Sequence, residues 1–306
     1  MPELPEVETL RRGLEIEVTG RRILGTVVAN AKVLKEQTEA AFRERIVGRW
    51  IQQIDRRGKY LLLLLGDADP RANLSENGKT SVRDDRQHHD LPLASPLFLC
   101  IHLKMRGQLL LLPAETGLAP YHCVRIRLDD GRDLRFHDMW TWGEIRALTA
   151  EELAGVAGLA GMGPEPLSKD WSGAELRRRL AKRSGAVKSV LLDQRTVAGV
   201  GNIYADESLH RAGIHPERPA RSLTETETER LAEAIRTVLT EAVNGGGTLS
   251  DEYTDLAGKP GRYSPRVYDR GGQPCGVCGT KLTRIRLGGR GTVYCSRCQP
   301  FSEMVG

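Results

Sequence analysis

The sequence lacks the features of membrane and secreted proteins. No apolar run reaches about 18 residues, the length that a membrane-spanning helix needs. The opening residues 1–6 have neither a basic segment nor an apolar core, so we expect no secretory signal. Six cysteines are too few for a disulfide scaffold in a chain of 306 residues. These absences predict a cytoplasmic globular protein, long enough for two domains.

The charge is small overall but uneven along the chain. The formal net charge is only +5. Between Lys259 and Gly306, however, nine Lys and Arg residues stand against two acidic residues. A basic end of this kind is typical of a surface that binds phosphates. A solvated basic face without a ligand would have the same composition.

The first half of the chain has the alternating pattern of an antiparallel β-sandwich with a few helices. A short helix is expected first, because Pro5 suits an early helical position and an apolar stripe follows it. Apolar runs predict strands at 25–29, 50–54, 59–65, 97–103, 108–112, 124–128 and 133–136. We predict a first domain over residues 1–147.

One segment of this domain departs from the pattern. Residues 67–96 are rich in charged and small residues and show no periodicity. We interpret them as a disordered insertion, in which His88 and His89 are a loop pair rather than a metal site. Cys100 and Cys123 lie in apolar strand runs and are expected to be buried thiols.

The second half is predicted to be helical. Residues 148–167 are rich in Gly, Ala and Pro, as is typical of a linker between domains. Helices are expected from Ser168 or Ser172 to 182, and over 186–194 and 202–212. The run Ser222-Leu-Thr-Glu225 is interpreted as a capping box that opens a further helix. A compact DNA-binding domain over 168–262 would accommodate these helices, followed by a small domain over 263–306.

Four cysteines near the C-terminus have the spacing of a zinc site. Cys275 and Cys278, then Cys295 and Cys298, form two Cys-x2-Cys pairs separated by sixteen residues. Four thiolates can surround one Zn²⁺ tetrahedrally and stabilise a β-hairpin that has little core of its own. No open coordination position is evident, so the zinc should be structural. Two disulfides or idle thiols are the alternative, which a cytosolic location disfavours.

Several further motifs are spread over nearly the whole chain: Met1-Pro-Glu-Leu-Pro-Glu-Val-Glu-Thr9, Arg57-Gly-Lys-Tyr-Leu-Leu62, His102-Leu-Lys-Met-Arg-Gly107, Gly163-Pro-Glu-Pro-Leu-Ser168, Gly199-Val-Gly-Asn-Ile-Tyr-Ala-Asp-Glu-Ser208 and Gly258-Lys-Pro-Gly261. Together with the cysteine pairs, they resemble, in the same order, the motifs of the formamidopyrimidine-DNA glycosylases, bacterial enzymes that remove 8-oxoguanine and ring-opened purines. The resemblance implies an α+β fold with an N-terminal antiparallel β-sandwich, a helix–two-turn–helix domain and a β-hairpin zinc finger. It also implies a monomeric base excision repair enzyme that acts on damaged double-stranded DNA in the bacterial nucleoid.

The N-terminus has its own chemical logic. Removal of Met1 would leave Pro2 with a free secondary amine. An α-amino group titrates near about 7.7–8.0, against about 10.4 for lysine, so part of it is unprotonated at neutral pH. This amine can attack the sugar C1′ and displace the base, and the iminium ion that forms favours elimination of the phosphates. The alternative is that Pro2 only stiffens the N-terminus and the nearby glutamates only cap a helix.

The resemblance assigns further roles to single residues. Glu3 resembles the general acid/base and Glu6 a partner that orders the same helix start. Lys59 and Arg290 match residues that bind phosphates at the lesion, and Lys59 also assists elimination. Lys188 matches a lysine that contacts the DNA backbone.

Two helix residues of the motif 199–208 are open to two interpretations. Asn202 matches a phosphate-binding asparagine, although it could simply cap the helix that it opens. Glu207 matches a buried glutamate near the active site, and a purely structural role suits it equally well. Lys59, without the resemblance, would be taken for a solvated lysine at a strand end.

The sequence departs from the family where the flipped base leaves a gap in the helix. The family fills that gap with three side chains. Met105 matches the first, but the usual Asp-Pro-Arg-Arg-Phe-Gly motif is here Asp138-Met-Trp-Thr-Trp-Gly143. Trp142 replaces the phenylalanine, and Trp140 replaces the arginine that pairs with the orphaned cytosine. A tryptophan cannot donate a guanidinium fork, so we expect a relaxed preference for cytosine. Alternatively, both indoles belong to the sandwich core.

Two other functions stay open. The chain could act on oxidised pyrimidines, as the related endonuclease VIII branch does, because the altered gap-filling residues leave the lesion undetermined. It could also be a catalytically silent zinc-ribbon protein that only binds DNA. The presence of Pro2, Glu3 and Lys59 together argues against a silent relative.

Overall fold

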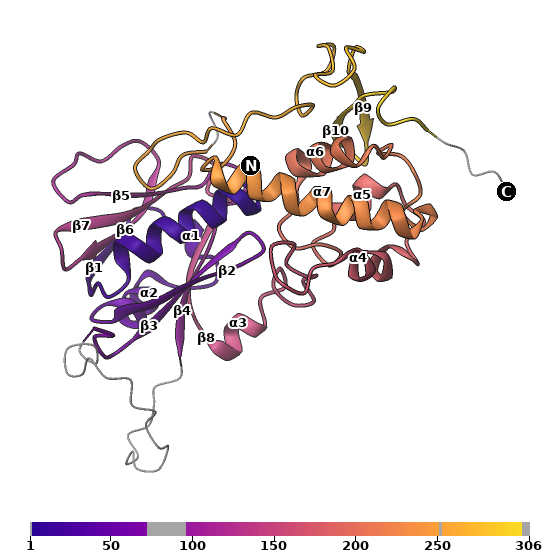
Figure 1. The fold of residues 1–306 in the computed structure, drawn as a ribbon. Coiled ribbons are helices and arrows are strands. Elements are labelled where there is room, and N and C mark those ends of the chain that lie inside the picture. Colours follow the sequence, from indigo (N-terminus) through magenta and orange to yellow (C-terminus); the bar gives the residue numbers. More distant parts are fainter. Residues whose placement is uncertain (1, 72–95, 251–252, 302–306) are drawn as a thin grey trace, which may run out of the picture.

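The computed structural model describes residues 2–71, 96–250 and 253–301, arranged as a β-rich half and a helical half, with a small hairpin packed against the helical half (Figure 1). Most of the predicted insertion, including the pair His88–His89, lies outside the described residues. The predicted α+β class is confirmed.

Helix α1 opens the chain and is longer than the short helix that the sequence predicts. It spans Leu4–Val18, with Glu3 as its N-cap residue and Pro5 in its first turn. The backbone N–H of Glu3 donates to Glu6 Oε2 over 2.8 Å, which fixes the first turn. The buried side chains of its apolar stripe, Leu10 and Leu14 among them, pack into the sandwich core.

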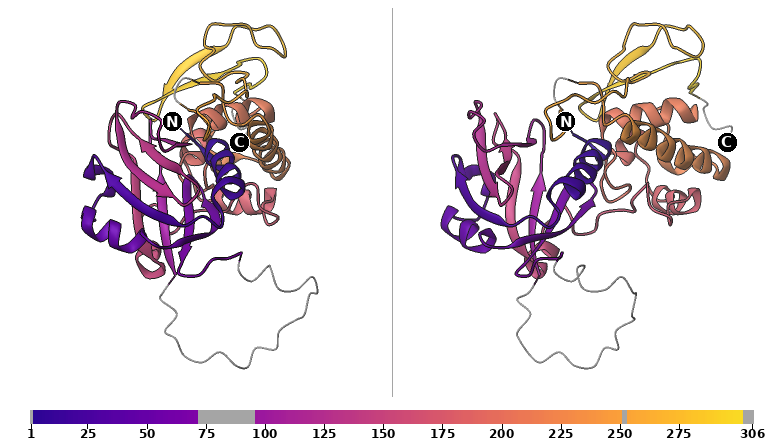
Figure 2. Two further views of the ribbon diagram at one scale, coloured as in Figure 1. Left: turned by 90° about the vertical axis from the view of Figure 1, so that its left-hand side faces the viewer. Right: turned by 60° about the vertical axis from the view of Figure 1, so that its left-hand side comes forward.

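Two four-stranded antiparallel sheets form the β-rich half (Figure 2). One sheet has the order β1 (Ile23–Val28), β6 (His122–Leu128), β7 (Arg132–His137) and β5 (Gln108–Pro113). The other has the order β2 (Trp50–Arg57), β3 (Tyr60–Gly66), β4 (Leu97–His102) and β8 (Glu144–Thr149). The inward side chains of both sheets and of α1 form one hydrophobic core, because alternate strand residues point to the same face.

All seven predicted strands are present, and Cys100 and Cys123 are buried as expected. Strand β8 was not predicted, and it extends through Thr149 into the stretch expected to be a linker. Three short helices were not predicted either: η1 (Ala31–Leu34), α2 (Glu39–Ile46) and α3 (Ala150–Ala154).

The helical half contains α4 (Gly173–Leu180), α5 (Val187–Leu191), α6 (Asn202–Ala212), η3 (Ala220–Ser222) and α7 (Glu225–Asn244). The predicted capping box at Ser222 and Glu225 is wrong, since α7 is capped by Thr224 and Glu227. Ser222 still belongs to η3, where its hydroxyl donates to the Pro219 carbonyl over 2.8 Å. The Ser222 hydroxyl is therefore bonded within η3, and Thr224, two residues later, caps α7 instead.

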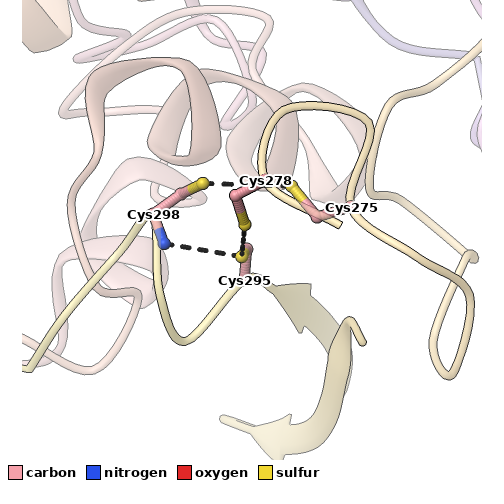
Figure 3. Close-up of side chains that lie close together, drawn as sticks. All are labelled: Cys275, Cys278, Cys295 and Cys298. Atoms are coloured by element: carbon pink, nitrogen blue, oxygen red, sulfur yellow. Dashed lines mark hydrogen bonds between the residues drawn. The ribbon is translucent and has the colours of Figure 1, made fainter. Parts of the chain in front are cut away.

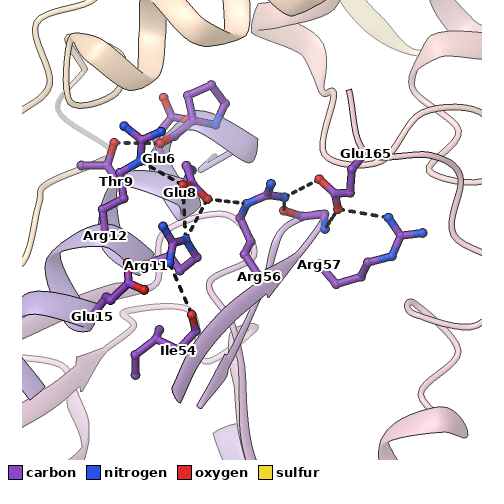
Figure 4. A network of polar contacts seen from close by, with 12 residues as sticks. Glu6, Glu8, Thr9, Arg11, Arg12, Glu15, Ile54, Arg56, Arg57 and Glu165 are labelled. Atoms are coloured by element: carbon purple, nitrogen blue, oxygen red, sulfur yellow. Dashed lines mark hydrogen bonds and ion pairs between the residues drawn. The ribbon is translucent and has the colours of Figure 1, made fainter. Parts of the chain in front are cut away.

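A partly buried ion-pair network attaches the β2–β3 turn to the segment before α4 (Figure 4). The Arg56 guanidinium lies between two carboxylates, 3.0 Å from Glu8 Oε2 and 2.8 Å from Glu165 Oε2. Glu165 Oε1 also accepts the backbone N–H of Gly58 over 2.6 Å and lies 3.1 Å from Arg57 Nη1. Lys59 directly follows Gly58 in this turn. The network therefore also fixes the backbone position of Lys59.

A two-stranded hairpin, β9 (Thr283–Leu287) and β10 (Arg290–Tyr294), follows the helices. Its small core consists largely of cysteine and aliphatic side chains. Among the described residues, no helix combines the length and the apolar character needed to cross a membrane.

Replacing Glu227 by Gln should destabilise the helical half in a pH-dependent way. Hydrogen bonds from Arg218 lower the pKa of Glu227 from about 4.5 to about 2. The ionised carboxylate therefore contributes stability above pH 4.5 that is lost as the pH falls toward 2. We expect urea denaturation to show a loss of about 1–2 kcal/mol at pH 7, after discounting for solvent screening. The difference should shrink below pH 4.5, and Glu229→Gln on the same helix, the control, should cost little at either pH.

Candidate active site and nucleic-acid interface

The carboxylate of Glu3 is buried against the first turn of α6. Glu3 Oε2 accepts the N–H of Gly201 over 2.8 Å, and Oε1 accepts the N–H of Ile203 over 2.9 Å. These N–H groups are among the donors that a helix start leaves without intrahelical partners. Burial raises the pKa of Glu3, although the nearby charge of Lys59 opposes this effect. Glu3 can therefore hold and release a proton closer to neutral pH than an exposed glutamate.

Glu6 is fixed by donors from three parts of the chain. Its Oε2 accepts the backbone N–H of Glu3, and its Oε1 accepts the Tyr204 hydroxyl over 2.6 Å and the Thr248 N–H over 2.8 Å. Pro2, which immediately precedes Glu3, is also buried. The structure thus brings Pro2, Glu3 and Glu6 together at one place, while their catalytic roles stay predictions.

Lys59 points into the same site and is only 7% exposed, so it is not a solvated lysine at a strand end. The site is so close-packed that a Cβ added to Gly201 would lie 2.5 Å from Glu3 Oε1 and 2.6 Å from Lys59 Nζ. A side chain at position 201 would therefore displace the Glu3 carboxylate or the Lys59 ammonium. Burial lowers the pKa of Lys59, and the charge of Glu3 counteracts that shift.

A cavity of about 490 Å³ beside Lys59 is lined by cationic side chains from the β-rich half, the helical half and the hairpin. Arg290 reaches it from β10, and Lys104, Arg195 and His102 also line it. These last three residues were not predicted as site residues, although His102 and Lys104 belong to the motif at 102–107. A cluster of cationic side chains around one hollow suits a phosphate backbone.

His102 is a neutral hydrogen-bond donor in this cavity. Burial, with the charges of Lys104 and Lys59, lowers its pKa to about 3. Its Nδ1 accepts the backbone N–H of Lys104 over 2.9 Å, so the ring proton of the neutral imidazole lies on Nε2.

Asn202 is the first residue of α6, and Gly201 is the N-cap residue, so Asn202 does not cap the helix. Its Nδ2 donates to the Gly291 carbonyl over 3.1 Å. Its Oδ1 is buried without a hydrogen-bond partner among the residues that the structure describes. Asn202 therefore lies where the helix start meets the hairpin, and its phosphate contact stays a prediction.

Lys188 lies inside the protein rather than on its surface. Its ammonium is 2.7 Å from Asp206 Oδ1 and donates to Thr292 Oγ1 over 2.7 Å and to the Gly291 carbonyl over 3.0 Å. Asp206 Oδ2 accepts the N–H of Val293 over 3.0 Å. The ion pair thus attaches β10 to α5 and α6, and the contact of Lys188 with DNA stays a prediction.

Glu207 holds the segment that leads to the hairpin. Its carboxylate accepts the backbone N–H groups of Arg266, Val267 and Tyr268 over 2.8–2.9 Å and the Tyr263 hydroxyl over 3.1 Å. These contacts give the buried Glu207 a structural role, which is to attach the segment before the hairpin to α6.

The two tryptophans of the loop 138–143 face solvent. Trp140 is 40% and Trp142 56% exposed, so neither belongs to the sandwich core. Met105 is half-buried in the turn between β4 and β5. The base of the tryptophan loop is held by the buried Asp138 carboxylate, which accepts the N–H groups of Trp140 and Gly143 over 2.9 and 2.6 Å.

The four cysteines of the hairpin converge, as the spacing predicts (Figure 3). Their sulfur atoms all lie within 4.8 Å of one another, with 3.4 Å between Cys278 and Cys295 and 3.9 Å between Cys275 and Cys298. Tetrahedral coordination with Zn–S bonds of about 2.3 Å places sulfurs about 3.8 Å apart. The donor set and its spacing therefore fit one structural Zn²⁺.

Comparisons with known proteins agree along the whole chain. Residues 1–145 match the formamidopyrimidine-DNA glycosylase N-terminal domain, residues 162–253 the H2TH domain of the same enzymes, and residues 272–300 the zinc finger found in FPG and IleRS. A formamidopyrimidine-DNA glycosylase of Geobacter sulfurreducens is 41% identical over 301 residues, 98% of this chain and 100% of the relative. The chain belongs to the formamidopyrimidine-DNA glycosylase family.

Solved structures agree with this assignment. The MutM (Fpg) protein of Thermus thermophilus has a TM-score of 0.79 at 37% identity, covering 99% of this chain and 100% of that one. The Lactococcus lactis Fpg, solved in complex with DNA that contains an abasic site, has a TM-score of 0.81 at 28% identity, covering 97% and 99%. As a formamidopyrimidine-DNA glycosylase, the chain is a DNA-binding repair enzyme with glycosylase and AP lyase activity and a zinc finger.

Replacing Lys188 by Met tests whether this family member uses the lysine as an internal anchor. The variant leaves Asp206 buried without its partner, so we expect urea denaturation to show a loss of about 3–5 kcal/mol. The double variant Lys188→Met/Asp206→Leu should recover a large part of that loss. A contrary result would be a Lys188→Met protein of unchanged stability whose affinity for DNA depends less steeply on salt, because that would indicate a phosphate contact instead.

Proposed function

We propose that the chain is a bifunctional enzyme of base excision repair, which excises oxidised purines through its N-terminal proline and then cuts the strand. The observation that carries this proposal is the buried position of Pro2 and Glu3 against the start of α6, with Lys59 beside them. A nucleophile, a carboxyl group with a raised pKa and a cation for the phosphate are the groups that the reaction needs.

The proposed reaction begins with the Pro2 amine after removal of Met1. Its lone pair forms a bond to C1′ of the damaged nucleotide. The damaged base leaves with the electrons of the broken glycosidic bond and takes up the proton that the attacking amine loses. Glu3 donates its proton to the ring oxygen, which opens the sugar and leaves an iminium ion. The raised pKa of Glu3 keeps part of this carboxyl protonated toward neutral pH.

Strand cleavage then follows from the iminium ion. Loss of a proton from C2′ expels the 3′-phosphate by β-elimination. Loss of a proton from C4′ of the conjugated iminium ion that results then expels the 5′-phosphate by δ-elimination. Water finally hydrolyses the remaining iminium ion, which releases the sugar remnant as an aldehyde and restores the amine. Lys59 and Arg290 line the cavity where the departing phosphates would lie, and their charges would stabilise them.

Damaged double-stranded DNA is the proposed substrate. A polar cavity of about 510 Å³ beside Glu6, lined also by Thr248, Ser250 and Tyr253, is large enough for an extruded base. A Lactococcus lactis relative has been solved with DNA that contains Fapy-dG, a ring-opened purine. We propose the same substrate class for this chain, acting as a monomer on the DNA of the bacterial cytoplasm.

When bound, Zn²⁺ would link the two cysteine pairs and stabilise the hairpin, and it takes no part in the proposed reaction. The hairpin presents Arg290, at the start of β10, toward the cavity beside Lys59. Contacts of β10 with Lys188 and Asp206 fix its position against α6.

Oxidised pyrimidines are the second candidate substrates, because the exposed Trp140 and Trp142 replace the residues that this family usually places at the gap. A silent DNA-binding protein is disfavoured by the burial of Pro2, Glu3 and Lys59 in one site. Taking a lysine and a glutamate out of water costs free energy, and a catalytic use of both groups accounts for that cost.

Borohydride trapping tests the proposed chemistry. We expect the wild-type protein to form a covalent adduct with a duplex that carries 8-oxoguanine opposite cytosine, because borohydride reduces the iminium intermediate to a stable amine. Pro2→Gly replaces the secondary amine by a primary one and should greatly reduce the adduct. Glu3→Gln, which cannot donate a proton, should retain DNA binding while excision falls by about 100-fold or more.

The matched control is a protein with one extra residue before an unchanged Pro2, which converts the amine to an amide. This extended protein should bind DNA and form no adduct. Undiminished trapping by the extended protein would reject the proline as nucleophile. Trapping on oxidised pyrimidines alone would favour the second candidate, and no trapping on either lesion or on an abasic site would favour the silent one.

A further inference from the structure

Three side chains form a layered cluster at the edge of the β-rich half. The Trp140 and Trp142 rings lie 5.1 Å apart, tilted by 50°. The Arg106 guanidinium carbon lies 5.3 Å from the centre of the Trp140 ring, within the range of a cation–π contact. Arg106, Trp140 and Trp142 are called the tryptophan platform below.

The platform is held out toward solvent rather than collapsed onto the protein. Asp138 fixes both ends of the loop through the N–H groups of Trp140 and Gly143. The Lys35 ammonium also donates to the Trp142 carbonyl over 3.2 Å. Thr141, between the two indoles, has a φ of +54°, a left-handed conformation that β-branched residues rarely adopt. Backbone strain of this kind persists where the surroundings impose it, and it is frequent at ligand-binding positions.

The platform also lies beside the proposed base-binding cavity. Arg106 contacts Trp140 on one side and lines the cavity next to Glu6 on the other. An extruded nucleotide in that cavity would therefore leave its unpaired partner base near the indoles. Large exposed aromatic side chains at such a position can take the place of the missing base in the stack.

We propose that the tryptophan platform receives the orphaned base by stacking, so that the enzyme excises its lesion with little regard to the base opposite. This inference rests on the proposed function. All four bases have a π-face on which an indole stacks, whereas an indole offers only one hydrogen-bond donor. Arg106 is a positioning residue, because its guanidinium packs on the Trp140 ring and holds that ring in the platform.

The first test compares single-turnover excision of 8-oxoguanine opposite cytosine, thymine, guanine and adenine. A bidentate contact to a base edge discriminates by about fivefold or more, so without one we expect the four wild-type rates to lie within about fivefold. Trp140→Arg introduces a guanidinium and should create a preference for cytosine of about fivefold or more. Trp142→Phe, the matched control, keeps an aromatic ring and should leave the ratios unchanged.

A second test addresses Arg106. Arg106→Gln should slow excision opposite all four bases by a common factor while the ratios stay the same. Tryptophan fluorescence should be quenched when the wild type binds a duplex with an abasic site, because bases stack on the indoles. The quenching should be weaker in Arg106→Gln, measured at saturating DNA on a variant with a wild-type thermal unfolding profile.

The results that would overturn the inference differ from those that would overturn the proposed function. A wild-type preference for cytosine well above fivefold, or ratios that change in Arg106→Gln, would show that a side chain reads the orphaned base by hydrogen bonds. Borohydride trapping of an abasic site does not require recognition of the base opposite the site. A wild type that traps the abasic site but prefers cytosine strongly therefore rejects only the platform, whereas failure to trap at all rejects the chemistry.

Discussion

The contact between the Glu3 carboxylate and the start of α6 is the constraint on which the site depends. It joins residues that are 198 positions apart in the chain, and it removes a carboxylate from water only because backbone N–H groups receive it. The neighbouring N–H of Leu4 donates to the Gly199 carbonyl over 3.1 Å, so the chain start forms a second bond to the same turn. Gly199, with a φ of +79° and Leu4 against it, has no space for a side chain. Pro2 is thereby held where the two halves of the protein meet.

Helix α6 extends this constraint to the zinc finger. Its first turn binds Glu3, its middle carries Asp206 and Glu207, and its last turn places His210 Nε2 3.5 Å from Cys275 Sγ. One short helix therefore sets the position of the N-terminus, of the hairpin and of the segment between them. This arrangement explains why buried charge is concentrated on a helix whose remaining residues are mostly apolar.

The sequence was sufficient for features that depend on local pattern. Alternation predicted the strands, the cysteine spacing predicted the metal cluster, and α6 has the predicted bounds because Gly201 precedes it and Gly213 ends it in a left-handed conformation. Features that depend on contacts between distant segments were out of reach. The capping box of α7 was misplaced because Ser222 is bonded within η3. The burial of Lys188 and the position of Arg106 over Trp140 could not be predicted, because neither depends on the local periodicity of the sequence.

The central claim is that the N-terminal amine, rather than a lysine, carries the covalent intermediate. Lys59 is the competing amine, because it is buried in the same site and burial lowers its pKa. Mass spectrometry of peptides from the borohydride-trapped adduct distinguishes the two directly. The account predicts that the deoxyribose remnant is attached to the nitrogen of Pro2 in the peptide that begins there. Attachment to Nζ of Lys59, or to any other lysine, would contradict it.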